Sequence, residues 1–201
     1  MKNIVYIDHF DSFANTIAAY FRMAGADVDV YKSTCDLDAI AAKDPDLILL
    51  GPGPSGPKEA GNYMEAIERF HRTHPMFGIC LGFQAMMQYF GEEVVQLEEA
   101  VHGAASRLQH TGTHVFEGIE NPAEFARYHS LGAYGVPESF VGLAHFPDTN
   151  GKSIVMAARH KELPIAGVQF HPESILSSGN GQGEQLIKNV LYHLAGAPKE
   201  R

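Results

Sequence analysis

The sequence predicts an α/β fold, an open and mostly parallel sheet flanked by helices with a small antiparallel β addition. Short apolar runs such as "NIVYI" and "DLILL" alternate with stretches whose apolar residues recur at helical spacing, which is typical of βαβ units. After residue 94 the chain breaks into shorter strand-like pieces punctuated by Gly and Pro, which predicts the antiparallel part. No linker, low-complexity tract or internal repeat is visible, so we expect one domain over residues 1–201.

The first half of the chain reads as four strand and helix pairs. "NIVYI" and "DLILL" are continuous apolar runs, as expected of strands buried on both faces, whereas "DVDVY" alternates. The first helix has Phe13, Ile17 and Phe21 on one face and Gly25 as its end. The expected strands cover residues 3–7, 27–31, 46–50 and 76–79, and the expected helices cover 11–25, 37–43, 63–72 and 81–91.

The second half is less regular. We expect short strands at the pieces "SRLQ", "THVF", "FARY" and "SIVMAAR", which cover residues 106–109, 113–116, 125–128 and 153–159. The chain then returns to a strong strand over 165–170, "IAGVQF", and ends in a helix over 184–196.

Composition excludes several classes of protein. There are 24 acidic and 15 basic residues, a formal net charge of -9, and nucleic-acid binding needs clustered Lys and Arg that the chain lacks. No apolar run approaches the roughly 20 residues that span a bilayer, and "MKNIVYIDHFDSF" turns polar too early for a secretory signal peptide. We therefore expect a soluble, cytoplasmic protein that binds neither nucleic acid nor a membrane.

Neither the cysteines nor the histidines predict a structural cross-link or a metal site. Cys35 and Cys80 are the only two cysteines, too few for a disulfide framework in a chain of this length. His110 and His114 have the spacing of helical metal ligands, but Gly112 lies between them and indicates a turn. We expect no metal in this chain.

Cys80 lies at an abrupt change from strand to helix. "GICLG" has the Gly-x-nucleophile-x-Gly form of a nucleophile elbow, with Gly78 and Gly82 giving room for close packing. A helix N-terminus beside the sulfur favours the thiolate, and the Leu81 N–H would face a developing oxyanion. The pattern is short, and by itself it fits a buried structural cysteine equally well.

A general base and a group to orient it follow a strong strand in "VQFHPES". His171 and Glu173 are two residues apart, and side chains at that spacing on an extended chain point the same way. Pro172 fixes the backbone between them. Such a pair can take a proton from a thiol, return it to a leaving amine and hold the imidazole in orientation.

The third motif is the rigid loop "LLGPGPSGP" after the third strand. Its Gly and Pro residues expose N–H groups that could cradle an anion or donate to an oxyanion. It lacks the ending of a P-loop, which disfavours phosphate, and a plain turn fits the loop as well. All three motifs fall at carboxyl ends of expected strands, where open α/β sheets bind their ligands.

Together these motifs resemble the class I (triad) glutamine amidotransferases, which share a flavodoxin-like fold. Within that class the chain is similar to the glutaminase subunits of anthranilate synthase (component II) and of its sister, aminodeoxychorismate synthase. The resemblance covers essentially the whole chain, and it is carried by "DHFDSF", "GPGPSGPKEAG", "GICLGFQA", "ARYHSL" and "FHPESILS". It implies a single type-1 glutamine amidotransferase domain.

The resemblance also assigns roles by position. It implies Cys80 as nucleophile, His171 and Glu173 as the rest of the triad, and the N–H groups of Gly53 and Leu81 as oxyanion donors. The residues that it implies for glutamine binding are Gly53, Pro54, Ser55, Gln84, Ser130 and Leu131.

Three positions depart from the family pattern. Ser55 stands where the family loop has its second glycine, Ala104 replaces the lysine of a His-Gly-Lys segment, and Phe83 stands where relatives often have His. These departures put in doubt the loop geometry, basal activity and any contact made by the lysine.

The function that the resemblance implies is hydrolysis of L-glutamine through a Cys80 thioester. Ammonia would pass to a chorismate-binding synthase subunit that makes anthranilate for tryptophan biosynthesis, or aminodeoxychorismate in the folate pathway. No cofactor is expected in this chain, and Mg²⁺ is expected on the partner. A stand-alone γ-glutamyl hydrolase and a non-catalytic regulatory binding subunit remain the alternatives.

Overall fold

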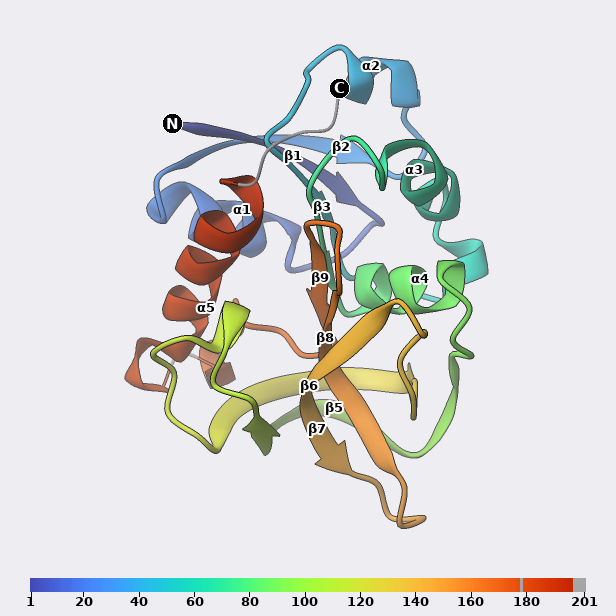
Figure 1. Cartoon of the computed structure of the whole chain (residues 1–201), viewed down its shortest axis with the longest axis vertical. Coiled ribbons are helices and arrows are strands. Elements are labelled where there is room, and N and C mark those ends of the chain that lie inside the picture. Colours follow the sequence, from blue (N-terminus) through green and yellow to red (C-terminus); the bar gives the residue numbers. More distant parts are fainter. Residues whose placement is uncertain (178, 197–201) are drawn as a thin grey trace.

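A nine-stranded sheet runs through the part of the chain that the computed structural model describes, residues 1–177 and 179–196 (Figure 1). Its strand order is β2-β1-β3-β4-β9-β8-β7-β5-β6. The strands are β1 (Lys2–Asp8), β2 (Ala26–Lys32), β3 (Leu47–Leu50), β4 (Met76–Ile79), β5 (Val95–His110), β6 (Ala123–Gly132), β7 (Phe140–Pro147), β8 (Ser153–His160) and β9 (Ile165–Val168).

The helices are short. The α-helices are α1 (Ala14–Met23), α2 (Leu37–Ala41), α3 (Tyr63–Phe70), α4 (Leu81–Tyr89) and α5 (Gln182–Val190), which continues as a π-helical turn at Leu191–Ala195. Short 3-10 turns lie at Pro57–Glu59, His114–Phe116, Ile175–Ser177 and Gly179–Gly181. Among the described residues, no helix has the length and apolar character needed to cross a membrane.

The parallel half of the sheet has the expected architecture. Strands β2, β1, β3, β4 and β9 are all parallel to one another, and their order is that of flavodoxin-like doubly wound sheets. The predicted α/β fold class is therefore confirmed. Every strand expected in the first half lies within two residues of the observed bounds, and β4 matches them at both ends.

Both faces of the parallel half are buried, because successive side chains of a strand point to opposite faces. Ile4 and Tyr6 of β1 join the cluster that packs under α1 and α5, whereas Val5 and Ile7 join the cluster under α3 and α4. Figure 1 shows the same arrangement, with α1 and α5 on one side of the sheet and α3 and α4 on the other. This explains the continuous apolar runs in the sequence.

The antiparallel part is larger than expected, and it continues the main sheet through β8, β7, β5 and β6. The longest of its strands, β5, has breaks in its pairing register with β6 between Gln96 and Val101 and between His102 and Ala104. Such bulges interrupt the apolar alternation that marks a strand. The sequence pattern therefore showed fragments where the chain has long strands, and it gave no separate signal for β7.

The expected strand at 113–116 is wrong. The residues form a 3-10 turn at His114–Phe116 instead. Gly112 and His114 both have positive φ, 71° and 57°, so the chain turns and cannot continue as a strand. Val115 and Phe116 are nevertheless fully buried, which accounts for the apolar signal.

Candidate active site

Cys80 lies directly between β4 and α4 and is buried. Its backbone has φ 52° and ψ -104°, a conformation that costs a residue with a side chain on the order of 1–3 kcal/mol. The Cys80 N–H donates to the Val168 carbonyl of β9 at 2.8 Å, and its carbonyl accepts from the Gln84 N–H at 3.0 Å. The strained turn is therefore held from the sheet and from the helix.

The two glycines that flank Cys80 are required by close approach. A Cβ at Gly82 would lie 2.1 Å from the Leu50 carbonyl oxygen, and one at Gly78 would lie 2.6 Å from the Phe83 backbone nitrogen. Real Cβ atoms do not come so close to backbone, so neither position accepts a side chain without movement of α4. The Gly82 N–H also donates to the Gly51 carbonyl at 3.0 Å, which ties the elbow to the loop after β3.

His171 and Glu173 form a buried pair behind the sulfur. Nδ1 of His171 lies 2.7 Å from Oε1 of Glu173, and their side chains are 3% and 1% exposed. The aromatic rings of Phe13 and Tyr128 pack against the imidazole, with ring centroids 5.4 Å and 5.0 Å away. These contacts shield the pair from water, and they give "DHFDSF" a structural role, since Phe13 belongs to it.

The pKa of His171 reflects two opposing effects. Burial lowers it, but the Glu173 carboxylate and then the Cys80 sulfur raise it, and the result lies well above the ordinary value of 6.5. Nε2 of His171 forms no hydrogen bond of regular geometry among the described residues, yet the adjacent Cys80 sulfur raises the pKa both by hydrogen bonding and by its charge. The imidazole thus holds a proton, with one nitrogen open to a reacting group.

A cavity of about 210 Å³ opens at Cys80. Of the ten residues that the sequence assigned to the site, eight line this cavity: Gly53, Pro54, Ser55, Cys80, Leu81, Gln84, Ser130 and Leu131. The other two, His171 and Glu173, lie behind Cys80 and outside the lining. Leu81 begins α4, where N–H groups have no carbonyl partner within the helix.

Gln84 and Leu131 contact each other directly. Nε2 of Gln84 donates to the Leu131 carbonyl at 2.9 Å, and Nδ1 of His129 lies 2.9 Å from the same oxygen. A carbonyl oxygen has two lone pairs, so the chain itself uses both. A contact from Leu131 to a bound amino acid must therefore come from other atoms of this segment.

The three departures from the family pattern have different structural consequences. Ser55 has φ 66°, so it adopts the left-handed conformation that glycine favours, at a cost of about 1–2 kcal/mol. Phe83 is 1% exposed and packs in the core below α4, away from the cavity at Cys80. Ala104 is exposed and lines a different cavity beside Arg127.

Gln169 was missed in the sequence. Its side chain is fully buried, its Nε2 donates to the Cys80 sulfur at 3.6 Å, and its Oε1 accepts from Gln84 at 3.1 Å. The signal was present, because Gln169 lies two residues before His171 and so shares its direction along an extended chain.

Tyr128, His129 and His102 also line the cavity and were not predicted. The first two lie within the quoted segment "ARYHSL", which pointed to the right strand. His129 is neutral at physiological pH, because burial and the neighbouring Arg127 lower its pKa to about 3. In the part of the chain that the structure describes, no group of three or more His, Cys, Asp or Glu side chains is placed to hold a metal ion.

The fold and this sulfur–imidazole–carboxylate site define a class of protein, and comparison with known families agrees. Residues 5–194 match the family described as Glutamine amidotransferase class-I. The chain belongs to this family, and it is a glutamine-hydrolysing enzyme subunit. A crystal structure from Thermoplasma acidophilum, described as a GMP synthase subunit, superposes with a TM-score of 0.83 over 97% of this chain and 94% of the other, at 22% identity, and it supports the fold.

Relatives of higher identity narrow the comparison. The anthranilate synthase component 2 of Haemophilus influenzae is 44% identical and covers 96% of this chain and 98% of its own. The aminodeoxychorismate/anthranilate synthase component 2 of Bacillus subtilis is 39% identical over 94% of this chain and 95% of its own length. The aminodeoxychorismate synthase component 2 of Escherichia coli is also 39% identical, over 94% of this chain and 99% of its own length.

Replacement of the carboxylate by an amide, Glu173→Gln, should lower the pKa of His171, because the effect of burial is then opposed by the Cys80 sulfur without the Glu173 charge. In the wild type the raised pKa stabilises the folded state fully below about pH 6.5, and this contribution is lost as the pH rises through the folded-state pKa. An NMR titration of the imidazole measures the shift.

The exposed Glu138→Gln is the matched control and should leave the titration of His171 unchanged. A His171 titration curve that is the same in wild type and Glu173→Gln would contradict the assignment of Glu173 as the group that raises the pKa.

Gln169→Met tests whether Gln169 positions the sulfur. Methionine keeps the length of the side chain but removes the donor to Cys80, and a hydrogen bond to a charged group contributes about 1.5–3 kcal/mol. We expect kcat for glutamine hydrolysis to fall about 10- to 100-fold with KM nearly unchanged, since Gln169 does not line the cavity.

Steady-state kinetics give kcat and KM, and thermal unfolding identifies any loss of stability. Gln88→Met, at the half-buried far end of α4, is the control and should keep full activity. An unchanged kcat in Gln169→Met, or a rise in KM alone, would show that Gln169 does not position the nucleophile.

Proposed function

We propose that L-glutamine binds in the cavity at Cys80 with its side-chain amide carbon against the sulfur. One observation carries this proposal: the sulfur and the predicted glutamine-binding residues line a single cavity of about 210 Å³, with the His171–Glu173 pair directly behind the sulfur. A cavity of this volume can hold one amino acid, and it has a nucleophile in its lining with a proton donor behind it.

The reaction runs in two halves. The Cys80 sulfur attacks the amide carbon, the His171 proton passes to the leaving nitrogen, and ammonia departs to leave a glutamyl thioester. Water then attacks the thioester carbonyl, His171 accepts its proton, and glutamate leaves as the sulfur regains its starting state. Glu173 keeps Nδ1 of the imidazole occupied, so that Nε2 faces the sulfur and the substrate.

Two backbone N–H groups would stabilise the negative oxygen in both halves. Leu81 contributes one as the first residue of α4, and Gly53 contributes the other from the loop after β3. A hydrogen bond between Gly82 and Gly51 links the two segments that carry these groups. Preorganised donors of this kind act without rearrangement during the reaction.

The relatives support a role within a larger synthase. Several of them are named component 2 of anthranilate or aminodeoxychorismate synthase, which supports a partner of the component 1 kind for this chain. We propose a chorismate-binding partner that holds Mg²⁺, with no cofactor in this chain. Ammonia must reach chorismate unprotonated, because ammonium has no lone pair, so an enclosed path between the subunits is expected.

We propose anthranilate as the product of the complex, for tryptophan biosynthesis. The Haemophilus influenzae relative, which is 44% identical, is named for anthranilate synthase and for no other enzyme. The second candidate is aminodeoxychorismate for the folate pathway, which the Escherichia coli relative favours. The Bacillus subtilis relative carries both names, so one glutaminase subunit for both products is a third form of the same proposal.

Two features of the chain follow from this function. A cysteine nucleophile needs a reduced thiol, and both cysteines are free in the structure, which supports a cytoplasmic location. The family match over residues 5–194 supports one amidotransferase domain over the chain.

A glutaminase assay of the purified chain tests the function, with and without a chorismate-binding synthase subunit. We expect hydrolysis that rises when the partner is added, and loss of at least about a thousandfold in Cys80→Ala. Cys35→Ala is the matched control and should keep full activity, because Cys35 lies in a separate loop bonded to Asn62.

The product of the assembled complex with chorismate then separates anthranilate from aminodeoxychorismate. Full activity without any partner would favour a stand-alone γ-glutamyl hydrolase. Glutamine binding without turnover would favour a regulatory subunit, and hydrolysis that survives in Cys80→Ala would contradict the mechanism.

A further inference from the structure

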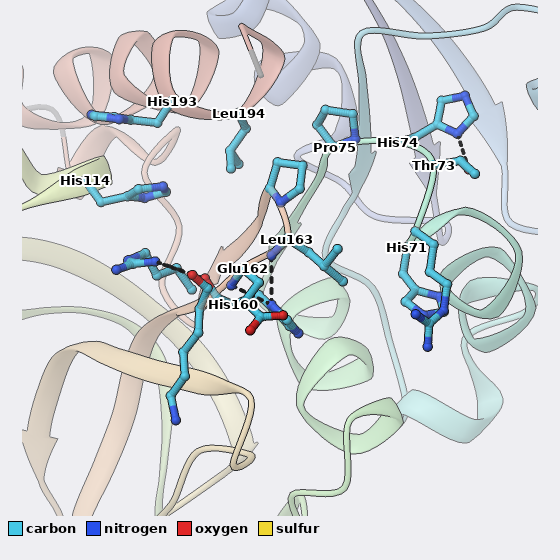
Figure 2. Close-up of a pocket in the computed structure, with 14 residues that line it drawn as sticks. His71, Thr73, His74, Pro75, His114, His160, Glu162, Leu163, His193 and Leu194 are labelled. Carbon is cyan, nitrogen blue, oxygen red and sulfur yellow. Dashed lines mark hydrogen bonds between the residues drawn. The ribbon is translucent and has the colours of Figure 1, made fainter. Parts of the chain in front are cut away.

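A second and larger cavity, of about 400 Å³, lies at the opposite end of β4 and β9 from the catalytic cysteine. Residues 71–75, which lead into β4, form one wall, and residues 159–164, which lead into β9, form another. His114 and the turn at His193 and Leu194 close a third side. Figure 2 shows these segments around the cavity, with His71 and His114 on opposite sides.

The lining carries more positive than negative charge. Arg72, Arg159 and Lys161 line the cavity, and Glu162 is its only acidic lining residue among those the structure describes. Neither Arg159 nor Lys161 forms an ion pair with a carboxylate within residues 1–177 and 179–196. In a chain with a net charge of -9, this is a local reversal of sign that attracts anions.

The guanidinium of Arg159 is held in place through Nη1, while its other nitrogens remain available as hydrogen-bond donors. Its Nη1 donates to the backbone carbonyls of His160, at 3.0 Å, and Lys161, at 3.5 Å. Nη2 and Nε have no partner in the described part of the chain, which leaves one edge of the planar group for a bidentate acceptor.

His114 adds a neutral hydrogen-bonding group to the cavity. Burial, His193 and Arg159 together lower the pKa of His114 to about 4, so this ring is uncharged at physiological pH. Its Nδ1 is buried and lacks a hydrogen-bond partner in the described residues, and its ring stacks on His193 at 4.7 Å. The histidines of the described residues form no metal-binding group, so the cations point to an anionic ligand.

Apolar side chains form the rest of the wall. Pro75 and Pro164 stand side by side where β4 and β9 begin, since the Met76 N–H donates to the Pro164 carbonyl at 3.0 Å. Leu163 and Leu194 extend this surface. A cavity with an apolar wall and a few convergent polar groups is typical of small-molecule sites, and an apolar wall gives little to a fully hydrated inorganic ion.

We propose that this cavity binds a small organic anion with an apolar body, of the aromatic carboxylate class. The carboxylate lies against the open edge of Arg159, and the apolar body packs on the two prolines and Leu163. Lys161, whose Nζ donates to the Glu138 carbonyl at 2.6 Å, adds positive charge at the same site. The site is separate from the chemistry at Cys80 and stands whether or not glutamine is the substrate there.

The test is a titration of the full ¹⁵N-labelled chain with sodium benzoate, followed by the backbone amide signals. We expect saturable shifts at the amides of residues 71–74 and 159–163, which line the cavity up to its two prolines. Benzamide, which has the same ring without the charge, and inorganic phosphate, which has the charge without the ring, should each bind at least about tenfold more weakly.

Two variants locate the anion. Arg159→Gln and Lys161→Gln should each weaken benzoate binding at least about fivefold, while Lys152→Gln in the exposed β7–β8 turn should leave it unchanged. Lys161→Gln covers the case in which loss of the Arg159 bonds disturbs the hairpin. Absence of shifts at these residues, equal binding of benzamide or phosphate, or insensitivity to both variants would overturn the proposal.

Discussion

The backbone conformation of Cys80 is the constraint on which the rest of the site depends. A positive φ is unfavourable for a residue with a side chain, and here the Val168 carbonyl on one side and the first turn of α4 on the other hold it. The same turn brings α4 so close to β3 that Gly82 has no room for a side chain. The packing of the sheet, α4 and the loop after β3 thus holds Cys80 in a backbone conformation that would be unfavourable by itself.

The pairing of β4 with β9 brings the two halves of the site together across 89 residues of sequence. The antiparallel strands between them take part in the site. The His171 N–H donates to the Ala126 carbonyl of β6 at 3.0 Å, and the same strand carries Ser130 and Leu131 into the cavity. Strand β6 therefore holds the His171 backbone and forms one wall of the cavity at Cys80.

Local patterns were enough to predict the parallel sheet and to nominate Cys80, His171 and Glu173 as one candidate site. Buried strands such as β3 appear as apolar runs, and Cys80, His171 and Glu173 each lie in a motif only a few residues long. The remainder depends on contacts between distant segments. Bulges hid the length of β5, a turn at Gly112 replaced a strand, and the link from Gln169 to Cys80 exists only once β4 and β9 pair.

The claim that Cys80 and the His171–Glu173 pair form one reactive centre is tested most directly by a glutamine analogue that carries a diazoketone in place of the side-chain amide. Peptide mass mapping after its reaction with the folded chain locates the covalent adduct. The structure predicts an adduct on Cys80 and none on the half-buried Cys35. An adduct on Cys35 alone, equal labelling of both thiols, or no adduct on a chain that hydrolyses glutamine would contradict it.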